Sequence, residues 1–105
     1  MIEFDTLKEK VLPICKKHNV EKAILFGSFA RNEASRHSDI DIIIIQNTTL
    51  RFLDRYDGIL AAFCRALPEW DVDLLIYTPE ELAKISARPF IMQAMKEGKV
   101  LYESV

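Results

Sequence analysis

The chain has 105 residues, of which 50% are hydrophobic and 29% are charged, and its formal net charge at pH 7 is −2. These values are typical of one folded globular domain and exclude a disordered chain. The sequence contains no apolar run near the ~20 residues of a membrane-spanning helix, no secretory signal and no basic cluster suited to nucleic acid. We therefore expect a single cytoplasmic domain over residues 1–105 that binds neither membrane nor nucleic acid.

The first expected element is a helix that ends at Asn19. Thr6 and Glu9 form a capping-box pattern at its start, and Pro13 predicts a kink within it. The two cysteines, Cys15 of this helix and Cys64, are expected to be reduced core thiols. The face of the helix that should pack on the core carries Leu7, Val11, Ile14, Cys15 and His18.

A short buried strand is expected over residues 21–26, and a tight turn at Gly27 and Ser28 ends it. Ser28 is expected to cap a short helix over residues 29–33. This arrangement directs backbone amides, and the positive end of a helix dipole, toward the turn. The turn is therefore suited to an anion such as a phosphate.

Two further strands are expected, each with acidic residues at its start. Residues 39–45 are rich in isoleucine, which predicts a strand buried on both faces. Residues 71–77 alternate between polar and apolar side chains at first and are then continuously apolar, which predicts another strand. Between them, one amphipathic helix is expected from Leu50 to about Leu67, where Pro68 stops it. Its apolar stripe would consist of Leu53, Tyr56, Leu60, Phe63 and Leu67.

The last third of the chain is expected to form helices and a closing strand. Thr78 begins a capping box with proline at the first helical position, and this helix should reach Ser86. Pro89 interrupts or restarts it, Gly98 is expected as a C′ residue, and residues 99–103 form an edge strand. The order of elements predicts a compact α/β fold. The residues expected in the core rather than at a partner are Phe90, Met92 and Met95.

Aspartates carry the candidate chemistry. Because side chains alternate along a strand, Asp39 and Asp41 project from one face, with Cα atoms ~6.6 Å apart. Unpaired charges beside an apolar strand are costly, and a divalent cation is a suitable partner for such oxygen ligands. Asp73 opens the next apolar strand and is expected either to bind the metal or to accept the proton of an incoming hydroxyl. Asp71 projects from the same face of the strand as Asp73, but it is expected to be solvated or to lie outside the set of direct metal ligands.

Gly27-Ser28, ten intervening residues, Asp39-Ile40-Asp41 and the later Asp73 resemble the signature of the DNA polymerase β-like nucleotidyltransferase superfamily. The phrase Gly-Ser-Phe-Ala-Arg-Asn-Glu-Ala and the small size are most similar to the MNT-domain proteins, minimal nucleotidyltransferases paired with HEPN toxins. The resemblance implies an α/β (α+β) fold with a small mixed β-sheet flanked by helices. The implied catalytic residues and metal ligands are Asp39, Asp41 and Asp73, and the implied nucleotide-binding residues are Gly27, Ser28 and Arg31.

The resemblance also implies an activity and a partner. The substrate would be ATP, and two Mg²⁺ ions would be the metal cofactor. The reaction would transfer AMP to the hydroxyl of a tyrosine on a cognate HEPN ribonuclease toxin. This modification would neutralise the toxin. Because the chain leaves no room for an acceptor-binding domain, a partner is expected to complete the site. Two alternatives stay open: a non-catalytic module that masks the toxin sterically, and a nucleotidyltransferase acting on a small molecule or an RNA end. Arg31 either contacts phosphate or is simply solvated; Arg36 and His37 are expected to be solvated.

Overall fold

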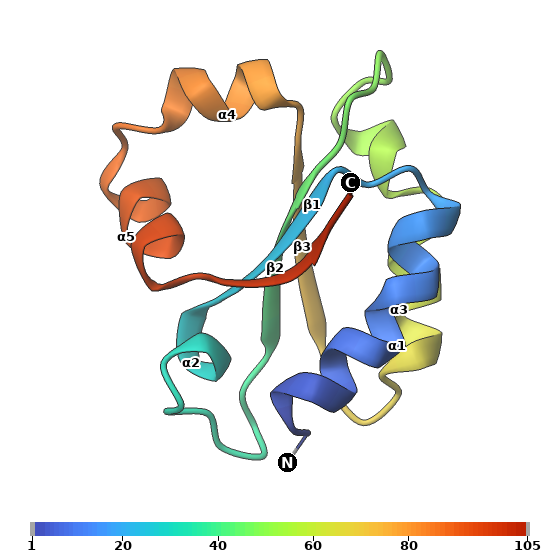
Figure 1. The fold of residues 1–105 in the computed structure, drawn as a ribbon, viewed down its shortest axis with the longest axis vertical. Coiled ribbons are helices and arrows are strands. Elements are labelled where there is room, and N and C mark those ends of the chain that lie inside the picture. Colours follow the sequence, from blue (N-terminus) through green and yellow to red (C-terminus); the bar gives the residue numbers. More distant parts are fainter. Residues whose placement is uncertain (1, 105) are drawn as a thin grey trace.

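A computed structural model describes residues 2–104, and within them a four-stranded sheet lies between two groups of helices (Figure 1). This confirms the predicted α/β class. No helix in the described range has the length and apolarity to span a bilayer. The strands are β1 (Lys22–Phe26), β2 (Ile40–Ile45), β3 (Val72–Tyr77) and β4 (Lys99–Glu103). The helices are α1 (Phe4–Lys17), α2 (Gly27–Ala30), the 3-10 helix η1 (Leu53–Tyr56), α3 (Ile59–Ala66), α4 (Pro79–Ile85) and α5 (Pro89–Glu97).

The sheet is mixed, with strand order β3-β2-β1-β4. β1 lies at its centre and pairs antiparallel with β2 and with β4, whereas β2 and β3 are parallel. The parallel pair is possible because α3 lies between β2 and β3 in the chain and supplies the crossover. β3 and β4 are therefore the two edge strands, as predicted for residues 99–103.

The two faces of the sheet are covered unequally. One face packs against α1 and α3 and forms the larger core, and the other lies toward α4 and α5 (Figure 1). Alternation along β2 explains the division, because Ile42 and Ile44 face the larger core while Ile43 and Ile45 face the smaller one. The smaller core comprises Ile24, Phe26, Ile43, Ile45 and Ala94.

The capping box predicted at Thr6 is wrong. α1 begins at Phe4, with Glu3 at its N-cap position and no side-chain cap, and the amide of Leu7 donates to the carbonyl of Glu3 at 2.9 Å. Phe4 packs against the core, so burial of this ring extends the helix one turn beyond the polar pattern. The helix then continues through Pro13 to Lys17.

The single helix predicted from Leu50 to Leu67 is also wrong. Gly58 has a φ of +80°, a left-handed conformation that ends one helical segment and begins another, so the region divides into η1 and α3. Leu53, expected on the apolar stripe, is 80% exposed. Cys64 on α3 is exposed as well, so only Cys15 of the two cysteines is a core thiol.

The C-terminal third contains one confirmed cap and two corrections. Thr78 and Glu81 form the predicted capping box. Gly98 follows α5 with an extended backbone at φ −62° rather than as a left-handed C′ residue. Its lack of a side chain matters because a Cβ would lie 2.4 Å from Cγ2 of Ile24. The residues expected in the core are instead exposed, at 59% for Phe90, 56% for Met92 and 39% for Met95.

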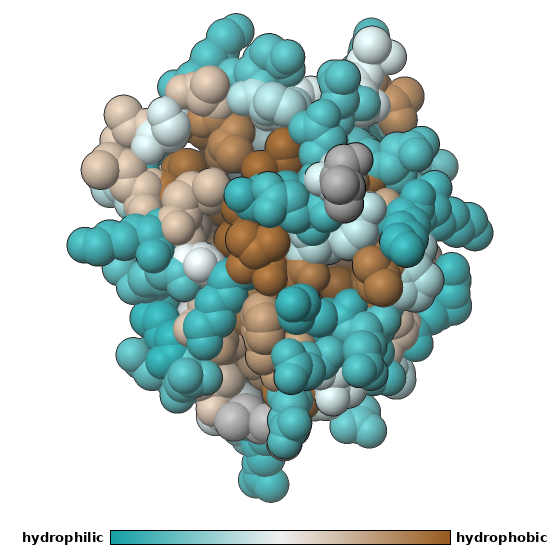
Figure 2. Space-filling model, viewed as in Figure 1, coloured by the Kyte–Doolittle hydropathy of each residue, from teal (hydrophilic) through white to brown (hydrophobic). Residues whose placement is uncertain are grey.

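The core face of α5 is formed by Ile91 and Ala94. Beside them a hollow of about 540 Å³ opens between α4, α5 and the sheet, and Figure 2 shows apolar side chains gathered in it. Ile45 and Leu82 are among its lining residues. The smaller face of the sheet is therefore only partly covered.

Candidate functional site

Asp41 and Asp73 lie side by side on the smaller face of the sheet. Phe26 pairs with Asp41 across β1 and β2, and Asp41 pairs with Asp73 across β2 and β3, so the three side chains form one row. The sequence motif thus brings two acids from strands more than thirty residues apart into one place.

Asp39 lies two residues before Asp41, next to this row. The sequence predicts it as the first residue of the strand, but β2 begins at Ile40, so Asp39 lies one position outside the strand and is exposed. The amide of Ile40 donates to the carbonyl of Asp71 at 2.8 Å, which ties together the starts of β2 and β3. The side chain of Asp71 is exposed, in agreement with a solvated residue.

Gly27 brings the backbone against Asp41. A Cβ on this glycine would lie 2.3 Å from Oδ2 of Asp41, and its φ of +73° is in the left-handed region. The prediction for Ser28 as an N-cap is wrong, because Ser28 lies inside α2 and Phe26 takes the N-cap position without a side-chain cap. The helix starts two residues earlier than expected because the left-handed glycine turns the chain at once.

The electrostatics of the row are unfavourable without a counter-ion. Burial raises the pKa of Asp41 to about 6, and the charges of Asp73 and Asp39 add to the effect. Arg31 acts in the opposite direction on this pKa. However, the guanidinium of Arg31 forms ion pairs with Glu33 at 3.3 Å and with Glu97 of α5 at 3.1 Å. The acids therefore concentrate negative charge that the protein itself neutralises only in part.

A divalent cation fits this donor set. Within residues 2–104 no three His, Cys, Asp or Glu side chains are already arranged to enclose an ion. Mg²⁺ does not require such a cage, because it commonly takes one or two carboxylates and completes its shell with water and substrate phosphates. Asp41 and Asp73 would supply the two carboxylates, and the charge of exposed Asp39 also acts on Asp41.

Sequence reasoning missed the aromatic residues around the acids. An open pocket of about 450 Å³ is lined by both carboxylate residues together with Tyr56, Phe26 and Phe90. Phe26 and Phe90 meet edge to face with ring centroids 5.8 Å apart. Tyr56 had been assigned to a helix stripe and Phe90 to the core, and no spacing signal distinguishes an aromatic core residue from one beside a site. Arg36 and His37 are exposed, as expected.

A family model described as "Polymerase beta, Nucleotidyltransferase" matches residues 9–104. The chain belongs to this nucleotidyltransferase family. The resemblance predicted from the spacing of the glycine, serine and aspartates is thereby confirmed. The roles of the individual site residues stay predictions.

Relatives of this nucleotidyltransferase include archaeal and bacterial proteins. "Putative protein adenylyltransferase MJ0604" of Methanocaldococcus jannaschii is 29% identical over 106 residues, which cover 97% of this chain and 100% of that protein. "Probable protein adenylyltransferase MntA" of Haemophilus influenzae is 35% identical over 77 residues, 71% of this chain and 67% of that protein. With a further M. jannaschii protein, MJ0435, the identity of 46% is confined to 43 residues, 46% of that protein's length.

Solved structures share the fold. A minimal nucleotidyltransferase superposes with a TM-score of 0.65 at 27% identity, covering 93% of this chain and 95% of that one. A chain from a toxin–antitoxin structure with AMP-PNP superposes with a TM-score of 0.67 at 24% identity, covering 92% of this chain and 73% of that one. The polymerase β-like fold with a mixed sheet is therefore confirmed.

Proposed function

We propose that this nucleotidyltransferase is an MNT-type antitoxin, which transfers AMP from ATP to a hydroxyl, that of a tyrosine, on a cognate HEPN-domain toxin and so neutralises it. The observation that carries the proposal is the row of Asp41 and Asp73 with the backbone of Gly27 against it. A protein that acted only by covering a toxin would have no use for two adjacent carboxylates, one of them half-buried in an otherwise apolar strand.

The residues would act as follows. The acceptor oxygen attacks the α-phosphorus of ATP, the bond from that phosphorus to the bridging oxygen breaks, and pyrophosphate leaves. Asp73 accepts the proton of the attacking hydroxyl, while Gly27 and Ser28 hold the leaving phosphates with backbone and hydroxyl groups. Asp39, Asp41 and Asp73 would hold up to two Mg²⁺ ions, which supply positive charge for the attacking and leaving oxygens.

The choice of AMP and of a toxin rests on relatives. The H. influenzae and M. jannaschii proteins are named as protein adenylyltransferases. Another structural neighbour, with a TM-score of 0.62 at 21% identity, is an MNT antitoxin in complex with a tri-AMPylated HEPN toxin of Shewanella oneidensis. These names support a protein acceptor over a small molecule or an RNA end for this chain.

The test is label transfer. The protein is incubated with ATP labelled at the α-phosphate, Mg²⁺ and a HEPN-domain protein as the acceptor. Asp41→Asn is expected to lower transfer by about a hundredfold or more, the scale of losing a group that acts in the transition state. Asp54→Asn is the matched control, because Asp54 is an exposed acid on η1 outside the site.

Two results would count against the proposal. Label transfer that survives both Asp39→Ala and Asp41→Ala would contradict the carboxylate mechanism. Neutralisation of the toxin that persists in Asp41→Asn, with no increase in the toxin's mass, would instead support a sterically masking module.

A further inference from the structure

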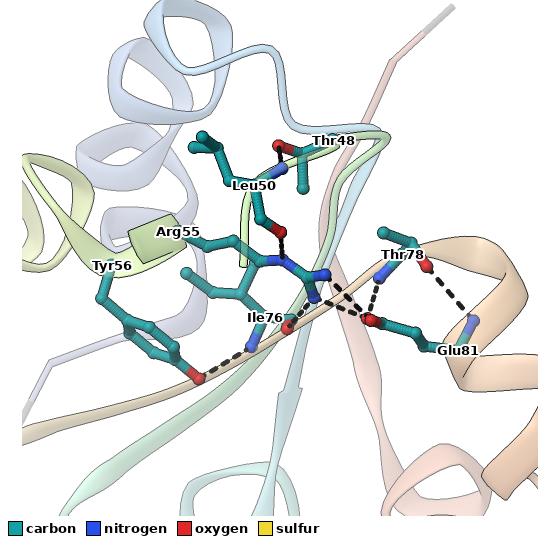
Figure 3. Close-up of polar contacts among 7 residues, drawn as sticks. All are labelled: Thr48, Leu50, Arg55, Tyr56, Ile76, Thr78 and Glu81. Carbon is teal, nitrogen blue, oxygen red and sulfur yellow. Dashed lines mark hydrogen bonds and ion pairs between the residues drawn. The ribbon is translucent and has the colours of Figure 1, made fainter. Parts of the chain in front are cut away.

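The outer edge of β3 is closed at one end by side chains. The amide of Ile76 donates to the hydroxyl of Tyr56 at 3.2 Å, and the carbonyl of Ile76 accepts from Nη1 of Arg55 at 3.2 Å (Figure 3). Both partners come from η1, so they bond the backbone of an edge strand that would otherwise face outward. This end of β3 is not available to another strand.

The other end of the same edge is open. The carbonyls of Asp71 and Tyr77 accept from amides of β2 and of the residue that follows it, so the odd-numbered residues of β3 bond inward. Because backbone groups alternate in direction along a strand, Val72 and Leu74 direct theirs outward, as Ile76 does. Within residues 2–104 these outward groups have no hydrogen-bond partner.

The pocket that contains the acids extends around this open edge. Its lining includes Asp73 and Leu75 from one face of β3, and Val72 and Leu74 from the other. Leu60 of α3 also lines it, on the side of the larger core. A space that borders both faces of an edge strand fits an added strand, whose side chains alternate between the faces.

We propose that the acceptor enters as an extended polypeptide segment that pairs with β3 at Val72 and Leu74. The inference rests on the proposed function and deepens it by naming how the acceptor binds. In such a pairing the row Phe26, Asp41, Asp73 continues onto the added strand, so the next side chain in the row lies beside Asp73. A hydroxyl-bearing residue at that position is directed at the carboxylate that takes its proton.

Charge and length define the segment further. Glu69 and Asp71 are exposed where the chain enters β3, so an acceptor segment with lysine or arginine beside the modified residue is favoured. Because Ile76 is already bonded to Tyr56 and Arg55, the pairing is confined to the stretch from Asp71 to Leu75. The partner therefore needs a short strand or an extended loop rather than a helix at the modified residue.

The decisive variant is Val72→Pro. Proline removes the outward amide and places its ring where the partner's carbonyl would lie, yet it is tolerated as the first residue of an edge strand. We expect the KM for the HEPN-domain acceptor of the assay above to rise by about tenfold, as for a lost hydrogen bond with a clash, while the KM for ATP is unchanged. Val72→Ala keeps the amide and should raise the acceptor KM less than about threefold.

Amide hydrogen exchange gives an independent readout that requires no catalysis. Addition of the acceptor is expected to slow exchange at Val72 and Leu74 by about a hundredfold or more, while amides of α1 serve as the internal reference. Label transfer without this protection, or equal acceptor KM values for Val72→Pro and Val72→Ala, would overturn the edge pairing and leave the proposed function intact. Protection without any label transfer would overturn the proposed function and leave the edge pairing intact.

Discussion

Arg55 should be the largest single polar contributor to stability in this fold. Its side chain is 6% exposed and donates to the carbonyls of Leu50 at 3.0 Å and Ile76 at 3.2 Å, and to both carboxylate oxygens of Glu81 at 2.5 and 2.8 Å (Figure 3). These bonds join η1, β3 and α4. The perturbation is Arg55→Met, which keeps an apolar stem and removes every donor.

The expected loss of unfolding free energy depends on which of the acceptor groups of Arg55 water can solvate once the guanidinium is removed. Ile76 is fully buried, so its carbonyl loses a partner that water cannot replace, at about 1–3 kcal/mol. Leu50 is 53% exposed, and Glu81 is partly exposed, so water can solvate their freed oxygens. A loss of about 2 kcal/mol in unfolding free energy lowers the melting temperature of a domain this size by about 8–16 °C.

The assay is urea unfolding followed by the fluorescence of Trp70, the single tryptophan. With a typical urea slope, the midpoint of Arg55→Met should fall by about 1 M. Arg51→Met is the matched control, since Arg51 is exposed four residues earlier. If the two variants unfold within about 0.5 kcal/mol of each other, the scale of an ordinary surface substitution, the assignment of a structural role to Arg55 is refuted.

Four further outcomes are expected. The Arg55 contact lowers the pKa of Glu81 to about 2 from 4.5, so the stability that this ion pair contributes is full above pH 4.5 and is lost as pH falls toward 2. The difference in urea midpoint between wild type and Arg55→Met should therefore narrow over that range, while the part due to the backbone bonds of Arg55 remains. Gly27→Ala places a methyl group against Asp41 at a positive φ, and should reduce nucleotide transfer by about tenfold or more while circular dichroism still reports a folded chain. Cys64 should react with a thiol reagent in the native protein, whereas Cys15, whose burial raises its pKa to about 12, should react only in urea; two native labels by mass spectrometry would contradict this. In EDTA, Asp41→Asn should melt above wild type because like charges are relieved, and unlike wild type it should gain no stability from added Mg²⁺.

The predictable part of the fold consists of elements with strong local signals. β2 follows from a run of isoleucines, and the start of α4 follows from the reciprocal cap of Thr78 and Glu81. A shared site for Asp41 and Asp73 could be anticipated as well, because each lies at the start of an apolar strand and alternation assigns each to a face. What spacing could not supply was that the two strands are parallel neighbours in register.

The unpredictable part depends on tertiary contacts. Gly58 could be tolerated within a helix, but in the structure it has a positive φ, and nearby Arg55 bonds the carbonyls of Leu50 and Ile76, contacts that no local pattern predicts. Phe90 lies on an apolar pattern that predicts burial against something, but the pattern does not identify what covers it. In the structure Phe90 borders the acidic pocket, where exposure of an aromatic ring is compatible with a bound nucleotide or partner.

The two ends of β3 differ in a way that connects stability to function. At Ile76 the backbone groups of the edge are bonded to Arg55 and Tyr56 of η1, and the charge of Arg55 is paired with Glu81 of α4. At Asp73 the edge is open, the acids repel one another, and the turn before them requires a left-handed glycine. Two of these features would be relieved by a ligand: the repulsion between the carboxylates by a cation, and the unpaired backbone groups of the open edge by an added strand. The side-chain bonds at Ile76 and the in-register pairing of β2 with β3 together fix the strand that carries Asp73, so its carboxylate stays beside that of Asp41.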